Sequence, residues 1–333
     1  MRAILIGCGD HGGGTLIPAC LSAGIRLAGL VDCDTSRAIA LAEQWNIPTV
    51  CASVEELHAG LDVEAAIVAL PATEQARHVI WALSSGLHVF VEKPPALDPD
   101  ELQMLIRKRR AAQRVCCVGI NFRSADGVQA LASRLDSGRY GRVSFARIVQ
   151  VARKPTEPFH QSCSFEASLF YAQGIHVLDL ALLLVPDIES INGQFIRAKR
   201  GRFCALTGEN VTASSRFEAS FGSCGAGFYH ELDVLSENGD LLSLRNLSEL
   251  VYLPNGGELS VDEYPGARVL WRRSPLGVGY TSAGYATELA AFRWRVLAQE
   301  PAAFASVADL EELVPVYDAF DCLLRSHGLR WLS

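Results

Sequence analysis

The sequence predicts an α/β domain with a parallel, doubly wound sheet over residues 1–121, followed over residues 122–333 by an α+β domain with a large, mainly antiparallel open sheet. In the first part, short and almost continuously apolar runs alternate with helix-like stretches, a pattern typical of parallel strands that are buried on both faces. In the second part, strand-like runs follow one another with glycine-containing turns and few helices between them, which favours antiparallel pairing. A length of 333 residues also favours two domains over one.

The first domain is expected to contain short apolar strands with helices between them. The strands cover residues 3–6, 26–31, 63–70, 88–92 and 115–120. The helices run from the loop after residue 6 to about residue 23, and over residues 36–45, 74–84 and 98–112. Asp98 or Asp100 is the expected N-cap of the last helix, because a carboxylate there accepts hydrogen bonds from first-turn N–H groups.

The second domain is expected to begin with helices and to continue as a sheet. Helices are expected over residues 126–137 and 166–185, on either side of a strand over residues 143–151. Further strand-like runs cover residues 190–196, 211–221, 227–235, 241–244 and 249–253. Two helices over residues 285–299 and 307–324 close the sequence and could pack back on the first domain.

Composition and charge exclude several classes of partner. Apolar residues make up 49% and charged residues 20% of the chain, the profile of a globular protein in water. A net charge of −7 without a basic cluster argues against nucleic acid and against an anionic membrane surface. The most apolar stretch, residues 167–185, carries Gln173, His176 and Asp179, which a membrane-spanning helix would hold only at considerable cost. The first apolar run is too short for a secretory signal, so a cytoplasmic protein is expected.

The cysteines indicate neither a metal site nor a disulfide framework. The sequence has ten of them, without a C-x-x-C pair and without a histidine at zinc-ligand spacing. Cys116 and Cys117 lie in an apolar run, where cysteine behaves as a small hydrophobic residue. Reduced thiols and no bound metal are therefore expected.

A glycine loop follows the first strand directly and opens a helix. Gly7, Gly9 and Gly12 form a G-x-G-x-x-G pattern, with Asp10 and His11 at its last two variable positions. Glycines allow the tight turn and let backbone N–H groups approach a pyrophosphate at the positive end of the helix. In this strand–loop–helix context the pattern predicts a Rossmann-type dinucleotide site.

An acidic residue ends the second strand. Asp32 lies 20 residues after Gly12, where a carboxylate would accept hydrogen bonds from the adenosine ribose hydroxyls. Because it would also repel a 2′-phosphate, NAD is favoured over NADP, which stays open as the second choice. Asp34 is interpreted as a helix cap.

Several motifs together resemble the Gfo/Idh/MocA family of NAD(P)-dependent oxidoreductases. Lys93, within Glu92-Lys93-Pro94, stands at the carboxyl end of a parallel strand, the edge at which ligands bind in open α/β sheets. The other matching segments are residues 70–71, 86–89, 121–123, 138–143 and 174–179. The resemblance implies a Rossmann domain and a substrate domain whose open sheet often forms a homodimer or homotetramer interface.

The resemblance also implies roles for individual residues. Lys93 would lie beside the nicotinamide and the reacting carbon and handle the proton, and His176 would assist it. Glu92, Pro71 and Gln75 would lie near the cofactor, although the family often has a histidine in place of Gln75.

The helix that carries His176 departs from the family pattern. Members that oxidise sugars and cyclitols typically have an aspartate four residues before this histidine, and this chain has Ala172. Since an imidazole normally needs a partner that fixes its tautomer, Asp179 could replace the missing acid. Asp179, Arg123 and Tyr171 are the candidate substrate contacts, with a buried or exposed structural role as the alternative for each.

The expected function is transfer of a hydride between a nicotinamide and a small polar substrate, a sugar, cyclitol or sugar derivative by the resemblance. The alanine at position 172 leaves a ketone or imine reductase of secondary metabolism open as an alternative. A non-catalytic dinucleotide-binding sensor is the alternative from another class, against which the presence of both Lys93 and His176 counts.

Overall fold

The computed structural model describes residues 1–57, 61–255, 266–276, 279–298 and 307–332. The chain folds into two compact units. The first unit comprises the chain up to Ser124 together with four later elements: α8 (Gly279–Ser282), α9 (Tyr285–Val296), β15 (Ala308–Asp309) and η5 (Glu311–Leu313). The second unit begins at Ala125 and includes the last helix, α10 (Val314–Ser326), from Pro315 onward. The sequence suggests one boundary at residue 121, and the structure adds the later elements to the first unit.

The first unit is built on a sheet in the order β15-β6-β5-β4-β1-β2-β3. Its strands are β1 (Arg2–Ile6), β2 (Arg26–Val31), β3 (Val50–Cys51), β4 (Ala65–Val68), β5 (His88–Glu92), β6 (Cys116–Gly119) and β15. All pairings are parallel except that of β15 with β6. Every residue of β4 and β6 is buried, as expected for strands that are covered on both faces.

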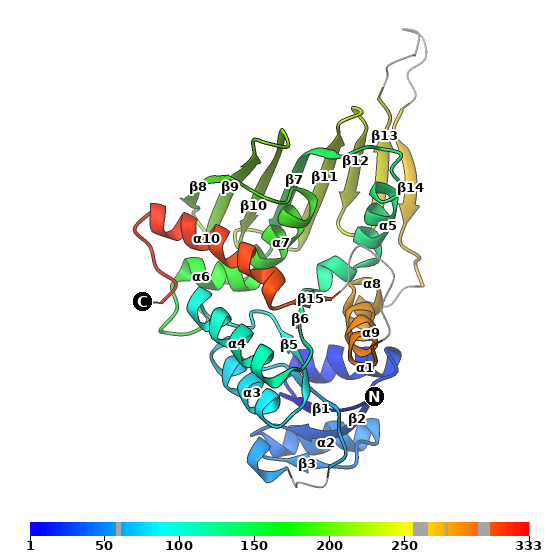
Figure 1. Ribbon diagram of the computed structural model, residues 1–333, viewed down its shortest axis with the longest axis vertical. Coiled ribbons are helices and arrows are strands. Elements are labelled where there is room, and N and C mark those ends of the chain that lie inside the picture. The colour runs from blue at the N-terminus through cyan, green and yellow to red at the C-terminus, as the bar shows by residue number, and fades with distance from the viewer. Residues whose placement is uncertain (58–60, 256–265, 277–278, 299–306, 333) are drawn as a thin grey trace. The chain divides into compact units, whose positions relative to one another are not determined.

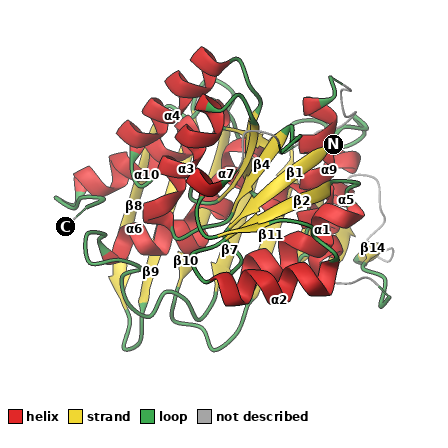
Figure 2. Cartoon of the chain, turned by 90° about the horizontal axis from the view of Figure 1, so that it is seen from below, coloured by secondary structure: helices red, strands yellow, loops and turns green. Residues whose placement is uncertain are grey.

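Helices and short helical turns lie between these strands or follow them (Figures 1 and 2). They are η1 (Gly12–Leu16), α1 (Ile17–Ser22), α2 (Thr35–Trp45), η2 (Val54–Glu56), α3 (Ala72–Ser84), α4 (Pro99–Ala112), η3 (Asn121–Ser124) and η5 (Glu311–Leu313). Asp34 and Asp98 cap α2 and α4 by accepting hydrogen bonds from Arg37 N and Glu101 N, respectively. Both caps agree with the sequence analysis, which names Asp34 as a cap and Asp98 as one of two candidates.

A helix from far along the chain completes the core of this unit. Helix α9 packs on β5, β6 and α1. Its residues Leu289 and Phe292 are fully buried, and the ring of Phe292 lies 5.8 Å from that of Phe90 on β5. The first unit is therefore completed by residues that follow the whole second sheet in sequence.

The second unit contains a sheet in the order β14-β13-β12-β11-β7-β10-β9-β8. The strands are β7 (Val143–Val151), β8 (Ser190–Arg197), β9 (Arg202–Asn210), β10 (Ser215–Gly222), β11 (Tyr229–Ser236), β12 (Leu241–Arg245), β13 (Glu249–Leu253) and β14 (Arg268–Arg272). All pairings are antiparallel except the parallel pair β7–β10. The fold class predicted from the sequence, a parallel Rossmann sheet plus a mainly antiparallel one, is confirmed.

One face of this second sheet is covered by helices (Figure 1). They are α5 (Asp126–Leu135), α6 (Phe165–Leu169), η4 (Phe170–Gly174), α7 (Ile175–Leu184) and α10. Burial alternates along β7, β9 and β11, so every second side chain points into the core. The helical stretch Phe165–Leu184 is long and apolar enough to cross a membrane by length and composition, but 78% of its most apolar window is buried in the protein, as in a core helix.

Several predicted elements need correction. The predicted strand 211–221 is wrong in its first part, because β9 ends at Asn210 and a turn precedes β10. Strand β9 was missed since Thr207, Gly208 and Asn210 dilute its apolar pattern, and β3 and β14 were missed because β3 has only two residues and β14 begins and ends with arginine. The predicted helix 307–324 begins instead as β15 and a short turn.

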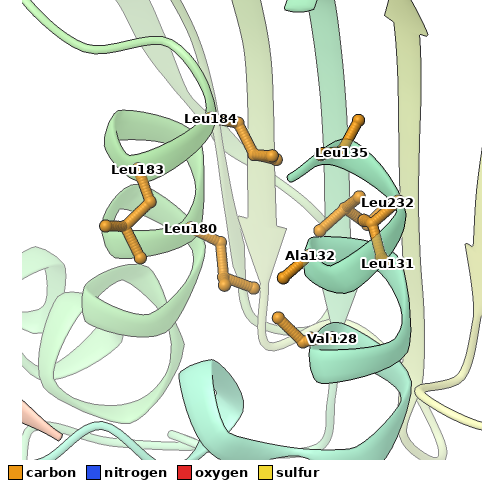
Figure 3. A pocket seen from close by; sticks show the side chains of 8 residues that line it. All are labelled: Val128, Leu131, Ala132, Leu135, Leu180, Leu183, Leu184 and Leu232. Carbon is orange, nitrogen blue, oxygen red and sulfur yellow. The ribbon is translucent and has the colours of Figure 1, made fainter. Parts of the chain in front are cut away.

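A small apolar cavity lies between α5 and α7 over the sheet (Figure 3). Its lining is Val128, Leu131, Ala132, Leu135, Leu180, Leu183, Leu184 and Leu232. The space amounts to about 10 Å³, no more than one water molecule would occupy, and its walls offer hardly any polar surface. Packing at this point of the core is therefore close to complete.

Replacing Leu232 by alanine should destabilise the protein by about 2–5 kcal/mol, because the removed atoms enlarge an existing apolar cavity. Leu232 on β11 is 0% exposed. The matched control is Leu235→Ala on the same strand, where the side chain is 37% exposed and the cost should stay below about 1 kcal/mol. Urea unfolding of both variants measures the difference, and equal losses would mean that Leu232 does not help to hold α5 and α7 on the sheet.

Candidate functional site

Two glycines of the glycine loop are required by close backbone packing within the first unit. Gly7 has a φ of 99°, and a Cβ atom there would lie 2.1 Å from the carbonyl oxygen of Ala69. A Cβ atom on Gly12 would lie 2.2 Å from the carbonyl oxygen of Gly7. A Cβ atom on Gly9, by contrast, would meet only the end of the Arg37 side chain, at 3.9 Å. Packing within the first unit thus requires glycine at positions 7 and 12, whereas Gly9 keeps the loop open to an approaching ligand.

Asp32 is tied to the glycine loop. Its Oδ2 accepts a hydrogen bond of 2.6 Å from Cys8 N, and its Oδ1 accepts one of 2.8 Å from Asp34 N. Burial raises the pKa of the neighbouring Cys8 thiol to about 12, and the Asp32 charge adds to this effect, so Cys8 stays a neutral thiol. Asp32 therefore joins the end of β2 to the loop. Each of its oxygens keeps a further lone pair for a ligand hydroxyl.

Lys93 stands on a turn that Gln75 holds from both sides. The Gln75 amide Nε2 donates to the carbonyl oxygen of Glu92 at 2.6 Å and to that of Pro94 at 3.1 Å. Gln75 itself is buried on α3, so the turn is anchored to a packed helix. The Lys93–Pro94 peptide bond is cis. Sequence reasoning named Gln75 but missed this clamp, because nothing local in sequence links residue 75 to residues 92–94.

The environment of Lys93 favours its neutral amine. The residue is half-buried, and burial lowers the pKa of its ammonium group, while the negative charge of Glu92 opposes that effect. A lysine with a lowered pKa carries a larger fraction of free amine near neutral pH, as a group that accepts a proton requires.

The side chain of Glu92, the residue before Lys93, contacts the glycine loop. Its Oε1 lies 3.0 Å from His11 Nε2. The His11 ring makes an edge contact with Tyr285 of α9, with the ring centroids 5.2 Å apart. The structure thus brings together the glycine loop, the exit of β5 and α9. The other two predicted cofactor residues lie at the edge of this arrangement, Asp10 exposed beside His11 and Pro71 as the N-cap residue of α3.

His176 and Asp179 both lie on α7 in the second unit and are both buried. A π-type turn, η4, directly precedes α7 and contains Ala172. Because a π turn is wider than an α turn, the four-residue relation between positions 172 and 176 is not that of a regular α-helix. Over residues 166–181, Ala172 is the one residue that is not buried, so its side chain is partly exposed.

The remaining predicted contacts have structural partners. Tyr171 is fully buried and stacks on Trp331, with ring centroids 6.0 Å apart, inside an aromatic cluster. Arg123 is buried in the first unit and forms an ion pair with Glu312. These contacts account for both side chains without a substrate. Among the described residues, no group of three or more His, Cys, Asp or Glu side chains could hold a metal ion.

Comparison with known proteins extends this picture. Residues 1–120 match the model of the GFO_IDH_MocA family, described as an oxidoreductase family with an NAD-binding Rossmann fold. The D-glucoside 3-dehydrogenase of Escherichia coli is 26% identical over 211 residues, which are 61% of this chain and 60% of that protein. Inositol 2-dehydrogenase 3 of Saccharopolyspora erythraea is 25% identical over 227 residues, which are 65% of this chain and 64% of that protein.

A solved structure agrees over nearly the whole chain. The dehydrogenase from Chromobacterium violaceum has a TM-score of 0.88 at 24% identity and covers 98% of this chain and 94% of its own. In sequence, by contrast, the chain spans less than two thirds of the length of the two curated relatives. The family model confirms the resemblance seen in the sequence: residues 1–120 match the NAD-binding Rossmann domain of the Gfo/Idh/MocA oxidoreductase family, and the curated relatives and the shared fold agree with it.

Proposed function

We propose that this protein is an NAD-dependent oxidoreductase that acts on a hydroxyl-bearing carbon of a small polar substrate, a sugar, a cyclitol or a derivative of one. The observation that carries the proposal is the lysine of lowered pKa on a turn clamped by Gln75, next to the glycine loop. The curated relatives support the substrate class, since they are named for a glucoside and an inositol.

The first unit fits the dinucleotide. Gly9 leaves the backbone of the loop accessible to a pyrophosphate, and Asp32 has lone pairs left for ribose hydroxyls. Bound NAD would supply the hydride acceptor, and this chain would hold it and manage the accompanying proton. Pro71, Gln75 and Glu92 surround the turn at the same sheet edge and complete the proposed cofactor side.

Lys93 is the proposed proton carrier. As a free amine it would accept the proton of the substrate hydroxyl while the hydride leaves the same carbon, and in the reverse direction its ammonium group would return that proton to the carbonyl oxygen. His176 is the proposed second group on the substrate side, with Asp179 as the carboxylate that orients it on α7. Both are buried, so neither is a solvated surface group.

Ala172 favours a second candidate within the same chemistry. Without an acid at position 172, the chain has fewer groups for removing a proton from an alcohol. Reduction of a ketone or imine needs only a proton donor and a polarised substrate, so a ketone or imine reductase is the alternative.

The choice of cofactor should depend on Asp32. We expect tighter binding of NADH than of NADPH, and the ratio of the two Kd values should fall about tenfold or more in Asp32→Asn, because the carboxylate no longer repels the 2′-phosphate. Asp34→Asn, two residues on and exposed, is the control and should leave the ratio unchanged. Fluorescence titration measures all four constants. A wild type that prefers NADPH, or an unchanged ratio in Asp32→Asn, would contradict this role of Asp32.

Lys93→Met should lower kcat by roughly 10²–10⁴ while the Kd for NADH stays within about threefold, since the variant removes the proton carrier and keeps the length of the side chain. Lys108→Met, on the exposed side of α4, should behave as the wild type. Turnover would be followed at 340 nm with glucosides and inositols plus NAD, and with ketones and imines plus NADH. Tight NADH binding without turnover of any of these substrates would instead support a non-catalytic sensor.

Introducing a negative charge at position 172 should change catalysis. Ala172→Asp is expected to change the pH–rate profile or the preferred substrate without changing the Kd for NADH, because a carboxylate at this partly exposed position can act on His176 or on the substrate. Ala172→Asn has the same size without the charge and is the control. Identical profiles for the Asp and Asn variants would mean that position 172 does not face the substrate.

A further inference from the structure

An ionisable cluster surrounds the turn of Lys93 within the first unit. It consists of Glu92 at the end of β5, His11 in the glycine loop, and Tyr285 and Glu288 on α9. The Glu92 side chain is 8% exposed, whereas that of His11 is 41% exposed. The 3.0 Å contact between them therefore joins a buried carboxylate to a ring that is open to solvent.

Glu288 brings a second carboxyl into this cluster. It is 1% exposed, and within the described part of the chain neither of its carboxyl oxygens has a hydrogen-bond partner. Burial raises the pKa of Glu288 well above its usual range, and the charge of Glu92 raises it further. Two ionised carboxylates cannot share such a site cheaply, so the protonated form of Glu288 is favoured beside the Glu92 carboxylate.

Burial is the main influence on the pKa values of Tyr285, Glu288 and Lys93, and the charge of Glu92 acts on all three as well. This charge raises the pKa values of the Tyr285 phenol and the Glu288 carboxyl, and it opposes the effect of burial on Lys93. The raised pKa values favour the protonated, neutral forms of Tyr285 and Glu288. Glu92 is therefore the charged neighbour that acts on Lys93. The one variable that remains is how strongly His11 offsets the charge of Glu92.

We propose that His11 is a positioning residue of the catalytic turn: by engaging the Glu92 carboxylate, it sets how much negative charge acts on the amine of Lys93. A cationic group at position 11 cancels part of the Glu92 charge, so the free amine of Lys93 persists to lower pH. A neutral group at position 11 leaves the full charge, which favours the ammonium form. The inference rests on the proposed function only in that Lys93 is taken as the proton carrier.

The chain offers a direct test that does not require turnover. It contains four lysines, and Lys108, Lys154 and Lys199 are exposed, so they serve as internal references. Trace acetylation with acetic anhydride at a series of pH values, followed by mass spectrometry of the Lys93 peptide, gives the titration of that amine in the full-length protein. The variants to compare are His11→Gln and His11→Arg, because their charges do not depend on pH.

The expected result is a Lys93 midpoint that is higher in His11→Gln than in His11→Arg by about half a pH unit or more, with the reference lysines unchanged. Glu92→Gln should give a lower midpoint than either variant. Glu288→Gln should leave the midpoint unchanged, because it replaces a carboxyl that is already neutral. Equal midpoints in the two His11 variants would overturn the proposal, and a lower midpoint in Glu288→Gln would overturn the assignment of the neutral carboxyl.

Activity separates this inference from the proposed function. If a substrate is turned over, the alkaline shift of the oxidation profile in His11→Gln relative to His11→Arg should match the shift in the Lys93 midpoint. If the midpoints differ as expected but no substrate is turned over, the electrostatic role of His11 stands and the proposed enzymatic function fails. Matching rate profiles with different midpoints would show that Lys93 does not carry the proton.

Discussion

Burial of both faces of the parallel sheet is the constraint on which the first unit depends. Strands such as β4 and β6 are closed to solvent along their whole length, so polar chemistry is confined to the ends of strands. The glycine loop, Asp32 and the Lys93 turn all follow the carboxyl ends of β1, β2 and β5. The same burial forces Gly7 and Gly12 to lack side chains, because Ala69 and the loop backbone occupy the space of a Cβ atom.

Because the polar groups are confined to this sheet edge, the charge of each one affects the protonation of its neighbours. Groups that would be solvated on an ordinary surface here interact through a low dielectric, so one charge at Glu92 reaches Lys93, Tyr285 and Glu288. Helix α9 packs beside this cluster and contributes the buried carboxyl of Glu288, for which the neutral form is favoured. His11, whose side chain is 41% exposed, is the member that contacts the Glu92 carboxylate from the solvent side.

Much of this arrangement could be predicted from the sequence, because it depends on local pattern. The glycine loop, Asp32, the caps Asp34 and Asp98 and the exit of β5 each lie in a short segment whose residue types define its geometry. The links between segments could not be predicted in this way. The Gln75 clamp and the His11–Glu92 pair join residues that are 17 or more positions apart, and Glu288 enters the cluster only because α9 belongs to the first unit. No periodicity in a single sequence reports such contacts.

The helix that carries His176 is a second case in which the sequence alone does not predict the local geometry. Spacing alone puts Ala172 one α-helical turn before His176, yet the structure contains a π-type turn there. Gly174 lies in that turn, and a Cβ atom on it would lie 2.6 Å from the Phe221 ring, so the helix backbone approaches β10 too closely for a larger residue. The π-type turn thus lies where the helix packs closely against the sheet, and Ala172 in this turn is partly exposed while its neighbours are buried. Because α-helical spacing cannot define the relation of Ala172 to His176, counting residues along the helix cannot decide what the missing acid means for the site.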